Sequence, residues 1–436
     1  MTRMNTYRRI PNGVAPGRIS PFEHPRTITR SYVLRSIIHY AFYAFIFTIP
    51  FESVGFADDY LSLSKISGLF FVLTAFLSAR MCFRRPPMAF WYFFGYLSVV
   101  AVMIPFQQSD FISSIISRLI TMTQLLILFW ISCNLLGDER VVKGVLLALI
   151  MACTAVAILM LLGVGSADEH GRETALEANP NTLSTVLSLG LLALLGLAFG
   201  RQKSDFKTFL FMALCSGILA IQIVRTGSRG SLIALIVGFL AFPMKRTKSL
   251  ASRFGLVLVG ALAIGSLVWT SYRSESVRER WERTFATGDT AGRDTIFSDA
   301  WDMFLEKPML GWGPVTHLYE LGSRLGREYR DPHNLYLWVL TETGILGAIP
   351  FFIGLWLTWK SAWRARDGLQ GVLPLAMLVC LLISNVSGTL IDRKLFWIVL
   401  AYALASAYYT TYQKRPIGSP RKSQPASNRP MGLQAR

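Results

Sequence analysis

The sequence predicts an all-α polytopic membrane protein with about twelve transmembrane helices. Hydrophobic residues fill 52% of the 436 positions and only 16% are charged, compared with roughly 25% in an ordinary soluble domain. A soluble chain this apolar would need one very large core, whereas single cores stop growing at about 250–300 residues. Soluble, disordered and disulfide-rich secreted proteins are therefore excluded as classes, and the apolar residues are expected to lie in a bilayer.

Twelve apolar stretches approach or reach the length of about 17–25 residues that a helix needs to cross a bilayer. They occupy residues 36–54, 64–83, 88–106, 115–136, 143–165, 183–200, 207–224, 229–244, 254–271, 334–358, 372–391 and 395–412. Together they define a membrane domain over residues 36–412, between tails at 1–35 and 413–436. Both tails are polar and basic, so we expect them to be disordered and cytoplasmic.

The net charge of +18 follows this predicted topology. Most of the 44 Lys and Arg residues fall in the two tails and in every second loop, as expected for the cytoplasmic side of a membrane protein. Only Arg393 and Lys394 form a basic pair in a short outer loop. Because the charge follows the topology, nucleic-acid binding is disfavoured as an explanation for it.

Two outer loops, at 166–182 and 272–333, are longer than simple connections, and the second lies between the ninth and tenth predicted spans. Within it, a helical period of apolar residues predicts an amphipathic helix that begins at Arg293 and ends at Pro308. Its apolar face consists of Ile296, Phe297, Ala300, Met303 and Phe304. Such a helix lies on the membrane surface or caps a cavity, and long structured loops are usually functional. We therefore expect the chemistry at the outer face.

Arginine residues gather at the predicted outer ends of the helices. The arginines concerned are Arg172, Arg225, Arg229, Arg293 and Arg330. A guanidinium group donates two parallel hydrogen bonds to phosphate and stays charged in apolar surroundings, so these residues predict a site for a lipid-linked diphosphate. The alternatives are a snorkelling side chain for Arg229 and a solvated loop residue for Arg172. Arg293 opens a helix, where the dipole disfavours a cation, and this favours a functional role.

His333 is the histidine best placed for chemistry, because a predicted span begins directly after it. An imidazole with a pKa near 6.5 can accept a proton from a sugar hydroxyl at neutral pH. The alternative is a structural histidine at a helix end. The neighbouring Arg330 and Asn334 are expected to contact the substrate.

A metal site has little support in the sequence. There is no HExxH motif, and the five Cys residues lie within or at the ends of apolar stretches without CxxC spacing, which is typical of buried thiols. Asp58 and Asp59 form the one acidic pair that could serve a metal-dependent, polyprenyl-linked glycosyltransferase, and a solvated turn is the alternative.

Three motifs occur in order along the outer side. They are Ser-Arg-Gly at 228–230, Gly-Arg at 292–293 with the Pro-to-Gly segment at 308–313, and His-Asn at 333–334 followed after nine residues by Gly-Ile-Leu-Gly at 344–347. With these motifs the chain resembles the O-antigen ligase-like family of bacterial membrane glycosyltransferases, which includes ligases and polymerases. The resemblance covers about residues 35–412.

The resemblance implies a metal-independent, inverting transfer of a glycan from undecaprenyl diphosphate, without a cofactor, at the periplasmic face of the bacterial inner membrane. By motif position, Arg229 and Arg293 would bind the diphosphate leaving group and His333 would be the general base. Arg172 and Asn181 lie in another outer loop, where the family also has basic residues, and would contact the substrate.

Members of this family share a donor and differ in their acceptor. Ligases transfer the glycan to the lipid A core, polymerases extend a growing lipid-linked glycan, and other members glycosylate proteins. We place ligase first and polymerase second, because the acceptor side falls in the long loop and the sequence does not separate them. A transporter or flippase is the alternative from another class, disfavoured by the few ionisable groups in the spans and by the lack of matched broken helices.

Overall fold

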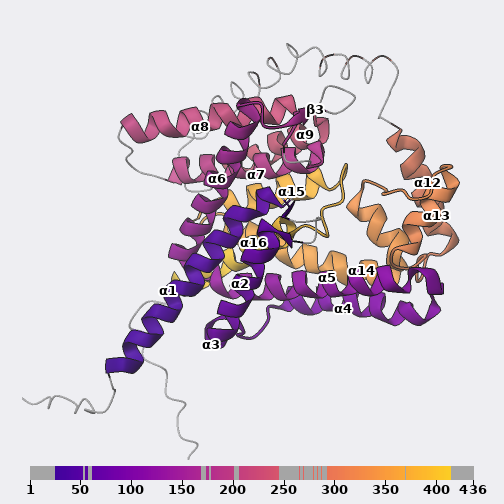
Figure 1. The fold of residues 1–436 in the computed structure, drawn as a ribbon, viewed down its shortest axis with the longest axis horizontal. Coiled ribbons are helices and arrows are strands. Elements are labelled where there is room, and N and C mark those ends of the chain that lie inside the picture. The colour runs from indigo at the N-terminus through magenta and orange to yellow at the C-terminus, as the bar shows by residue number, and fades with distance from the viewer. Residues whose placement is uncertain are drawn as a thin grey trace, which may run out of the picture.

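The computed structural model describes residues 25–52, 55–56, 61–167, 173–175, 178–200, 206–244, 292–368 and 370–413, with single residues between 265 and 286. Helices dominate these residues (Figure 1). The first are α1 (Pro25–Thr48), α2 (Leu63–Leu77), α3 (Ala79–Cys82), α4 (Met88–Met103), α5 (Ser109–Leu135), α6 (Glu139–Leu161), α7 (Pro180–Gly200), α8 (Phe206–Arg225) and α9 (Arg229–Phe239). They are followed by α12 (Arg293–Glu306), α13 (Thr316–Arg324), α14 (Leu335–Ala365), α15 (Leu373–Ser384) and α16 (Lys394–Gln413).

Short elements connect some of these helices. Single 3-10 turns are η1 (Ile49–Phe51), η2 (Ile104–Phe106) and η3 (Phe242–Met244). Two antiparallel ribbons pair β1 (Gly55–Phe56) with β2 (Leu61–Ser62) and β3 (Ser166–Ala167) with β4 (Glu173–Thr174). The strands lie in connections between helices, so the architecture is helical apart from these two ribbons.

The described helices confirm the expected helical membrane character. Each predicted span coincides with a helix or a helix pair except 254–271, of which the structure describes only residues 265 and 269. Six described helices are long and apolar enough to cross a membrane, namely α4 with η2, α5, α6, α7, α8 and α14. The total of twelve spans therefore stays a prediction.

Several helix boundaries differ from the sequence-based expectation, and two of them have a clear local cause. Helix α1 begins at Pro25, within the segment assigned to the N-terminal tail, because proline is well suited to the first turn of a helix. Helix α15 ends at Ser384, whereas the apolar stretch continues to residue 391. There Asn385 turns the chain, since its side-chain oxygen accepts the backbone N–H of Leu390 at 3.0 Å.

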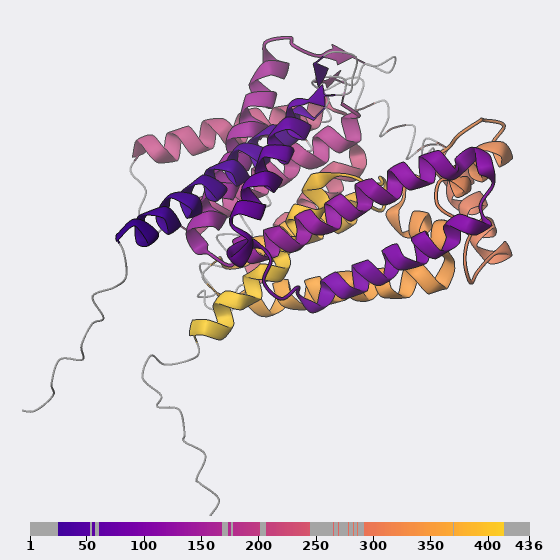
Figure 2. The same cartoon turned by 60° about the horizontal axis from the view of Figure 1, so that its bottom comes forward.

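The helices form two groups that share α15. Helix α14 packs along α4 and α16, and α16 packs along α5, as Figures 1 and 2 show. Helices α6, α7, α8 and α9 form the second group together with α1. Helix α15 contacts α7 and α9 on one side and α14 and α16 on the other, so its C-terminal end lies between the two groups.

The predicted amphipathic helix is confirmed as α12. Its residues Ile296, Ala300 and Met303 are buried in a small cluster with Leu321 of α13. Burial of such side chains contributes about 1.5–3 kcal/mol each. The apolar face of α12 therefore packs inward on α13 and α14 and holds the outer loop as a folded unit.

The outer loop is joined to α14 where that helix is interrupted at Gly344, which has φ 57° and ψ −159°. The backbone N–H groups of Trp312 and Gly313 donate to the carbonyls of residues 341 and 342 at 2.8 and 3.0 Å. In return, the N–H of Ile345 donates to the carbonyl of Pro308 at 2.8 Å. A Cβ at Gly344 would lie 2.5 Å from the backbone of Met309. These backbone hydrogen bonds form a seam between segment 308–313 and α14. The seam explains why residue 344 is a glycine, since only glycine adopts the required φ without a clash.

Candidate active site

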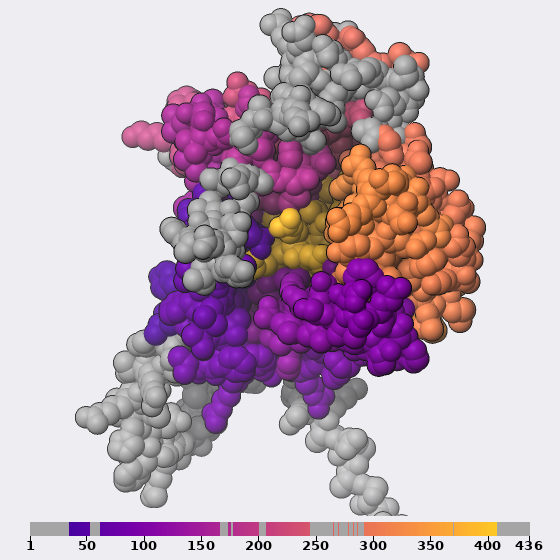
Figure 3. Space-filling view, turned by 45° about the vertical axis from the view of Figure 1, so that its right-hand side comes forward, coloured from indigo at the N-terminus to yellow at the C-terminus, as the bar shows by residue number. Residues whose placement is uncertain are grey.

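A cavity of about 120 Å³ lies where the amino end of α7, the start of α9, the turn before α14 and the α15–α16 connection meet. Its lining consists of Asn179, Asn181, Thr182, Thr185, Ser231, Asp331, His333, Ser384, Ser387, Gly388, Thr389, Leu390 and Arg393. Figure 3 shows this face hollowed above yellow C-terminal residues, between magenta, orange and purple walls. The lining is mostly polar, although most of the flanking chain is apolar.

His333 is held in the cavity by its own turn. It has a left-handed backbone with φ 51°, and its N–H donates to Asp331 Oδ1 at 2.6 Å. The hydroxyl of Thr389 donates to the same oxygen at 2.9 Å, so the α15–α16 connection fixes this turn. The His333 ring is 35% exposed, and its Nδ1 lies 3.9 Å from the Asp331 carboxylate.

The surroundings of His333 favour a neutral imidazole. Burial lowers the pKa of His333, Asp331 opposes this by raising the pKa, and the positive charges of Arg330 and Arg293 lower the pKa further. A neutral, partly exposed ring can accept a proton at neutral pH. Both arginines are therefore close enough for their charge to act on this ring.

Helix amino ends converge on the cavity from several directions. Asn179 and Asn181 belong to the amino end of α7, where the Asn181 N–H donates to Asn179 Oδ1 at 2.9 Å. Ser228 caps α9, and Arg393 directly precedes α16. His333 lies just ahead of α14. Because the amino end of a helix carries partial positive charge, the cavity is suited to an anion.

A chain of hydroxyl groups joins α7 to α9 beside the cavity. The hydroxyls of Thr185 and Ser231 are 3.0 Å apart, and Ser228 donates to Ser231 at 3.0 Å. Between the two serines of α9, a Cβ at Gly230 would lie 2.0 Å from the hydroxyl oxygen of Ser387. The glycine of the Ser-Arg-Gly motif therefore allows α9 to approach the α15–α16 connection closely.

Comparison with known proteins finds one similarity. Residues 211–352 match the family model described as O-Antigen ligase. No curated protein matches the chain.

Over residues 211–352 the chain is similar to the O-antigen ligase family.

The O-antigen ligase match runs from α8 to α14 and includes α9, α12 and α13. It covers all three motifs on which the resemblance was based. His333 lies inside the matched segment, and so does the seam at Gly344. The amino end of α7 and the α15–α16 connection lie outside it. The candidate site of this O-antigen ligase-like chain is thus completed by residues on both sides of the family segment.

The structure brings several of the predicted site residues together. His333 and Asn181 line the cavity. Arg293 and Arg330 lie near His333, as their effect on its pKa indicates. Arg229 opens α9 two residues before the lining residue Ser231.

Other predicted site residues have different surroundings. Arg225 does not line the cavity and lies 3.4 Å from Glu173 of β4 in an ion pair. Asn334 is the N-cap of α14, and its side-chain oxygen accepts the N–H groups of Tyr336 and Leu337 at 2.9 and 3.1 Å. This cap gives Asn334 a structural role at the start of α14. Arg172 lies outside the described residues.

Residues missed by the sequence analysis include Asp331, which orients the His333 turn, and Arg393, which lines the cavity. Arg393 and Lys394 are the basic pair that departed from the predicted charge pattern. Both face Glu52 at the end of α1, with Arg393 Nη1 at 3.8 Å and Lys394 Nζ in a direct ion pair. This departure from the charge pattern was the available signal for a basic group at the outer site.

A buried ion pair in the helix bundle was also missed. Arg118 of α5 donates through Nε to Glu342 of α14 at 2.9 Å and through Nη1 to both oxygens of Asp392 at 2.8 and 2.9 Å. Glu342 also accepts hydrogen bonds from the Tyr96 hydroxyl and from Trp338 Nε1. The spans thus contain paired charges, although few ionisable groups had been expected there. The sequence signal for this ion pair was the presence of Arg118 and Glu342 within apolar stretches.

No group of three or more His, Cys, Asp or Glu side chains that could hold a metal ion occurs among the described residues. The five Cys thiols are buried and free. Asp58 and Asp59, the rival acidic pair, lie outside the described part of the chain.

Proposed function

We propose that this protein transfers a glycan from undecaprenyl diphosphate to an acceptor hydroxyl at the periplasmic face of a bacterial inner membrane. The proposal depends most on one observation: a partly exposed imidazole, whose pKa is lowered by burial, shares a cavity with the amino ends of several helices. The similarity of residues 211–352 to the O-antigen ligase family, which comprises ligase- and polymerase-type glycosyltransferases, supports it. In this orientation both chain termini lie in the cytoplasm.

The diphosphate is assigned to the amino ends of α7, α9 and α16. As the bond between the anomeric carbon and the diphosphate oxygen lengthens, the leaving oxygen takes the electron pair and gains negative charge. Preorganised donors that face this charge stabilise the transition state. Arg229 and Arg293 are proposed to add their guanidinium charges, and Asn181 and Arg393 line the same cavity.

His333 is assigned as the general base. Its neutral ring would take the proton from the acceptor hydroxyl while the hydroxyl oxygen bonds to the anomeric carbon. Attack from the side opposite the diphosphate inverts the anomeric centre. Asp331 then stabilises the imidazolium that forms, because its carboxylate lies 3.9 Å from His333 Nδ1.

The first test compares His333→Ala and Arg293→Ala with Arg327→Ala, an exposed arginine of the same loop that lies outside the cavity. Loss of a general base costs about 10²- to 10⁴-fold in rate, and loss of a charge-stabilising donor costs about 10²- to 10³-fold. Transfer from the lipid-linked donor should fall accordingly in the first two variants and stay normal in Arg327→Ala. Full activity of both site variants at normal membrane levels would refute the assignment. Activity should also persist in EDTA.

The acceptor is tested by deleting the gene and examining the surface glycan. We propose the lipid A core as acceptor, which predicts lipid-linked polymer that accumulates beside a core without polymer. Loss of long chains with single repeat units still attached to the core would instead show a polymerase. Accumulation of donor on the cytoplasmic side would show a flippase.

A further inference from the structure

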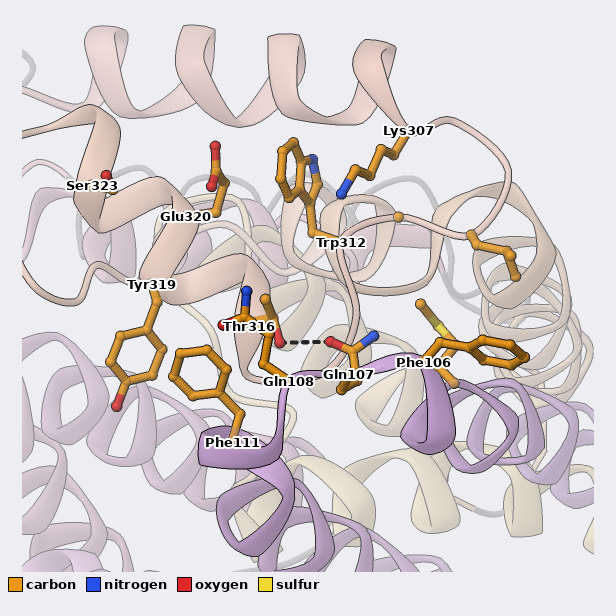
Figure 4. Close-up of a pocket in the computed structure, with 13 residues that line it drawn as sticks. Phe106, Gln107, Gln108, Phe111, Lys307, Trp312, Thr316, Tyr319, Glu320 and Ser323 are labelled. Carbon is orange, nitrogen blue, oxygen red and sulfur yellow. Dashed lines mark hydrogen bonds between the residues drawn. The ribbon is translucent and has the colours of Figure 1, made fainter.

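A second and larger cavity, of about 470 Å³, lies on the outer part of the molecule away from His333. Its floor is the turn between α4 and α5, and its other walls come from α13 and from the segment between α12 and α13 (Figure 4). This volume falls in the range of about 300–1,000 Å³ that is typical of small-ligand sites. None of its lining residues belongs to the first cavity.

The lining combines aromatic rings with uncharged polar groups. Phe111 and Tyr319 pack with ring centroids 4.6 Å apart on one side. Gln107 and Gln108 stand between them and Phe106, as Figure 4 shows. Each carboxamide offers both donors and an acceptor, and aromatic rings offer a flat apolar surface. This combination suits a sugar, which has an apolar ring face and a rim of hydroxyl groups.

The two glutamines keep hydrogen-bonding capacity for a ligand. Gln107 uses its Oε1 to accept the Thr316 hydroxyl at 2.6 Å (Figure 4), which leaves its amide nitrogen. Gln108 occupies the N-cap of α5 but makes no side-chain cap bond there. A Cβ at Gly313 would lie 2.3 Å from the Gln107 amide, so the Gly-Trp-Gly motif leaves the space that Gln107 occupies.

The lining of this cavity holds one cation, Lys307, and one anion, Glu320. Lys307 lies over the Trp312 ring with its Nζ 3.5 Å from the centroid. Glu320 accepts from Arg324 Nε at 2.9 Å. With one cation and one anion in the lining, a neutral polyhydroxylated ligand fits better than a phosphate.

Helix α5 connects the two cavities. Phe111 lines the second cavity, and Arg118, about 10 Å further along the helix, binds Asp392 beside the lining residue Arg393 of the first. Helix α5 therefore runs from the wall of the second cavity to an ion pair beside the first.

We propose that the second cavity binds the sugar chain of a substrate and thereby orients the glycan whose end reacts at His333. This proposal rests on the proposed function. The chemistry is that of a neutral oligosaccharide, from either the donor glycan or the acceptor oligosaccharide.

The test measures binding without catalysis, on the full-length protein in nanodiscs. Two fluorescent probes are used: lipid-free repeat-unit oligosaccharide from the host surface glycan, and lipid-free core oligosaccharide. Gln108→Ala removes one polar contact, and Ser323→Trp fills the cavity from its exposed rim. The controls are Glu306→Gln, which removes the other partner of Arg324, and Glu328→Trp, which places the same ring elsewhere in the loop.

Wild-type protein should bind one probe, and the probe that binds identifies the donor or the acceptor as the source. Gln108→Ala should weaken that binding by about three- to tenfold, as expected for one lost hydrogen bond, and Ser323→Trp should abolish it. Both controls should bind normally, and pyrophosphate binding should be unchanged in all variants. Absence of binding by wild type, or equal binding by all variants, would overturn the proposal. Failure of the proposed function would instead show as absent transfer from the lipid-linked donor, with oligosaccharide binding intact.

Discussion

Replacement of Glu342 by Met is expected to destabilise the protein by about 3 kcal/mol, because breaking a buried ion pair leaves one charge uncompensated. Glu342 is 0% exposed and Arg118 is 11% exposed. The substitution keeps a similar side-chain volume but removes the acceptor for Arg118, Tyr96 and Trp338. The expected loss lies at the low end of the usual range of about 3–5 kcal/mol, because Arg118 keeps its two bonds to Asp392.

The effect is measured as the shift in free energy of unfolding in detergent, where 3 kcal/mol corresponds to about a 100-fold change in the equilibrium constant. Glu139→Met is the matched control, since Glu139 pairs with Lys143 at 2.7 Å but both are exposed. Such an exposed pair should cost under about 1 kcal/mol.

A double variant separates loss of the ion pair from loss of packing. Arg118→Met with Glu342→Met removes both charges, so it should be more stable than Glu342→Met alone. Asp392 loses its partner but is 42% exposed and can be hydrated. The reasoning is refuted if Glu342→Met behaves like the Glu139 control, or if the double variant is less stable than Glu342→Met.

Three further outcomes follow from the geometry. Gly344→Ala should lower stability by more than about 2 kcal/mol, since it combines a positive φ with a 2.5 Å contact to the Met309 backbone, while Gly217→Ala, with open space around it, should not. The rate of transfer should fall as pH drops through a His333 pKa that lies below 6.5, and His333→Gln should remove this pH dependence from any residual activity. For His317, burial lowers the pKa to about 4, so the unfolded state takes up a proton first as the pH falls. The contribution of His317 to the free energy of unfolding is complete above pH 6.5 and declines by about 3 kcal/mol toward pH 4. A wild-type free energy of unfolding that does not change over this pH range, or the same decline in His317→Phe, would contradict this.

The membrane helices could be predicted from sequence because a bilayer requires long apolar segments with internal hydrogen bonding. The end of α15 could not, since residues 385–391 continue the apolar pattern and Asn385 interrupts the helix through a tertiary arrangement. The interruption of α14 at Gly344 could not be predicted from the sequence either. Its glycine spacing was recognised as a motif, but the reason for it is a hydrogen-bonded segment more than thirty positions earlier.

The candidate site was predictable where a residue type carried the signal by itself. A histidine ahead of a span and an asparagine in the first turn of α7 were found, and both line the cavity. The sequence could not distinguish Arg225 from the arginines predicted to bind the diphosphate. Its ion-pair partner Glu173 belongs to a two-residue strand, which leaves no recognisable sequence pattern. The hydroxyl groups of Ser231 and Thr389 were missed because nothing local distinguishes a serine or threonine in a cavity from one inside a helix.

The seam between segment 308–313 and α14 also sets the order of assembly during synthesis. The outer loop leaves the ribosome before α14 does, but its amide and carbonyl partners at residues 341–346 do not yet exist. The loop therefore cannot form these hydrogen bonds until α14 has been synthesised and inserted. At typical rates of about 5–20 residues per second, this takes a few seconds more. Until then α12 lacks its contacts with α14, and the packing of the outer loop is incomplete.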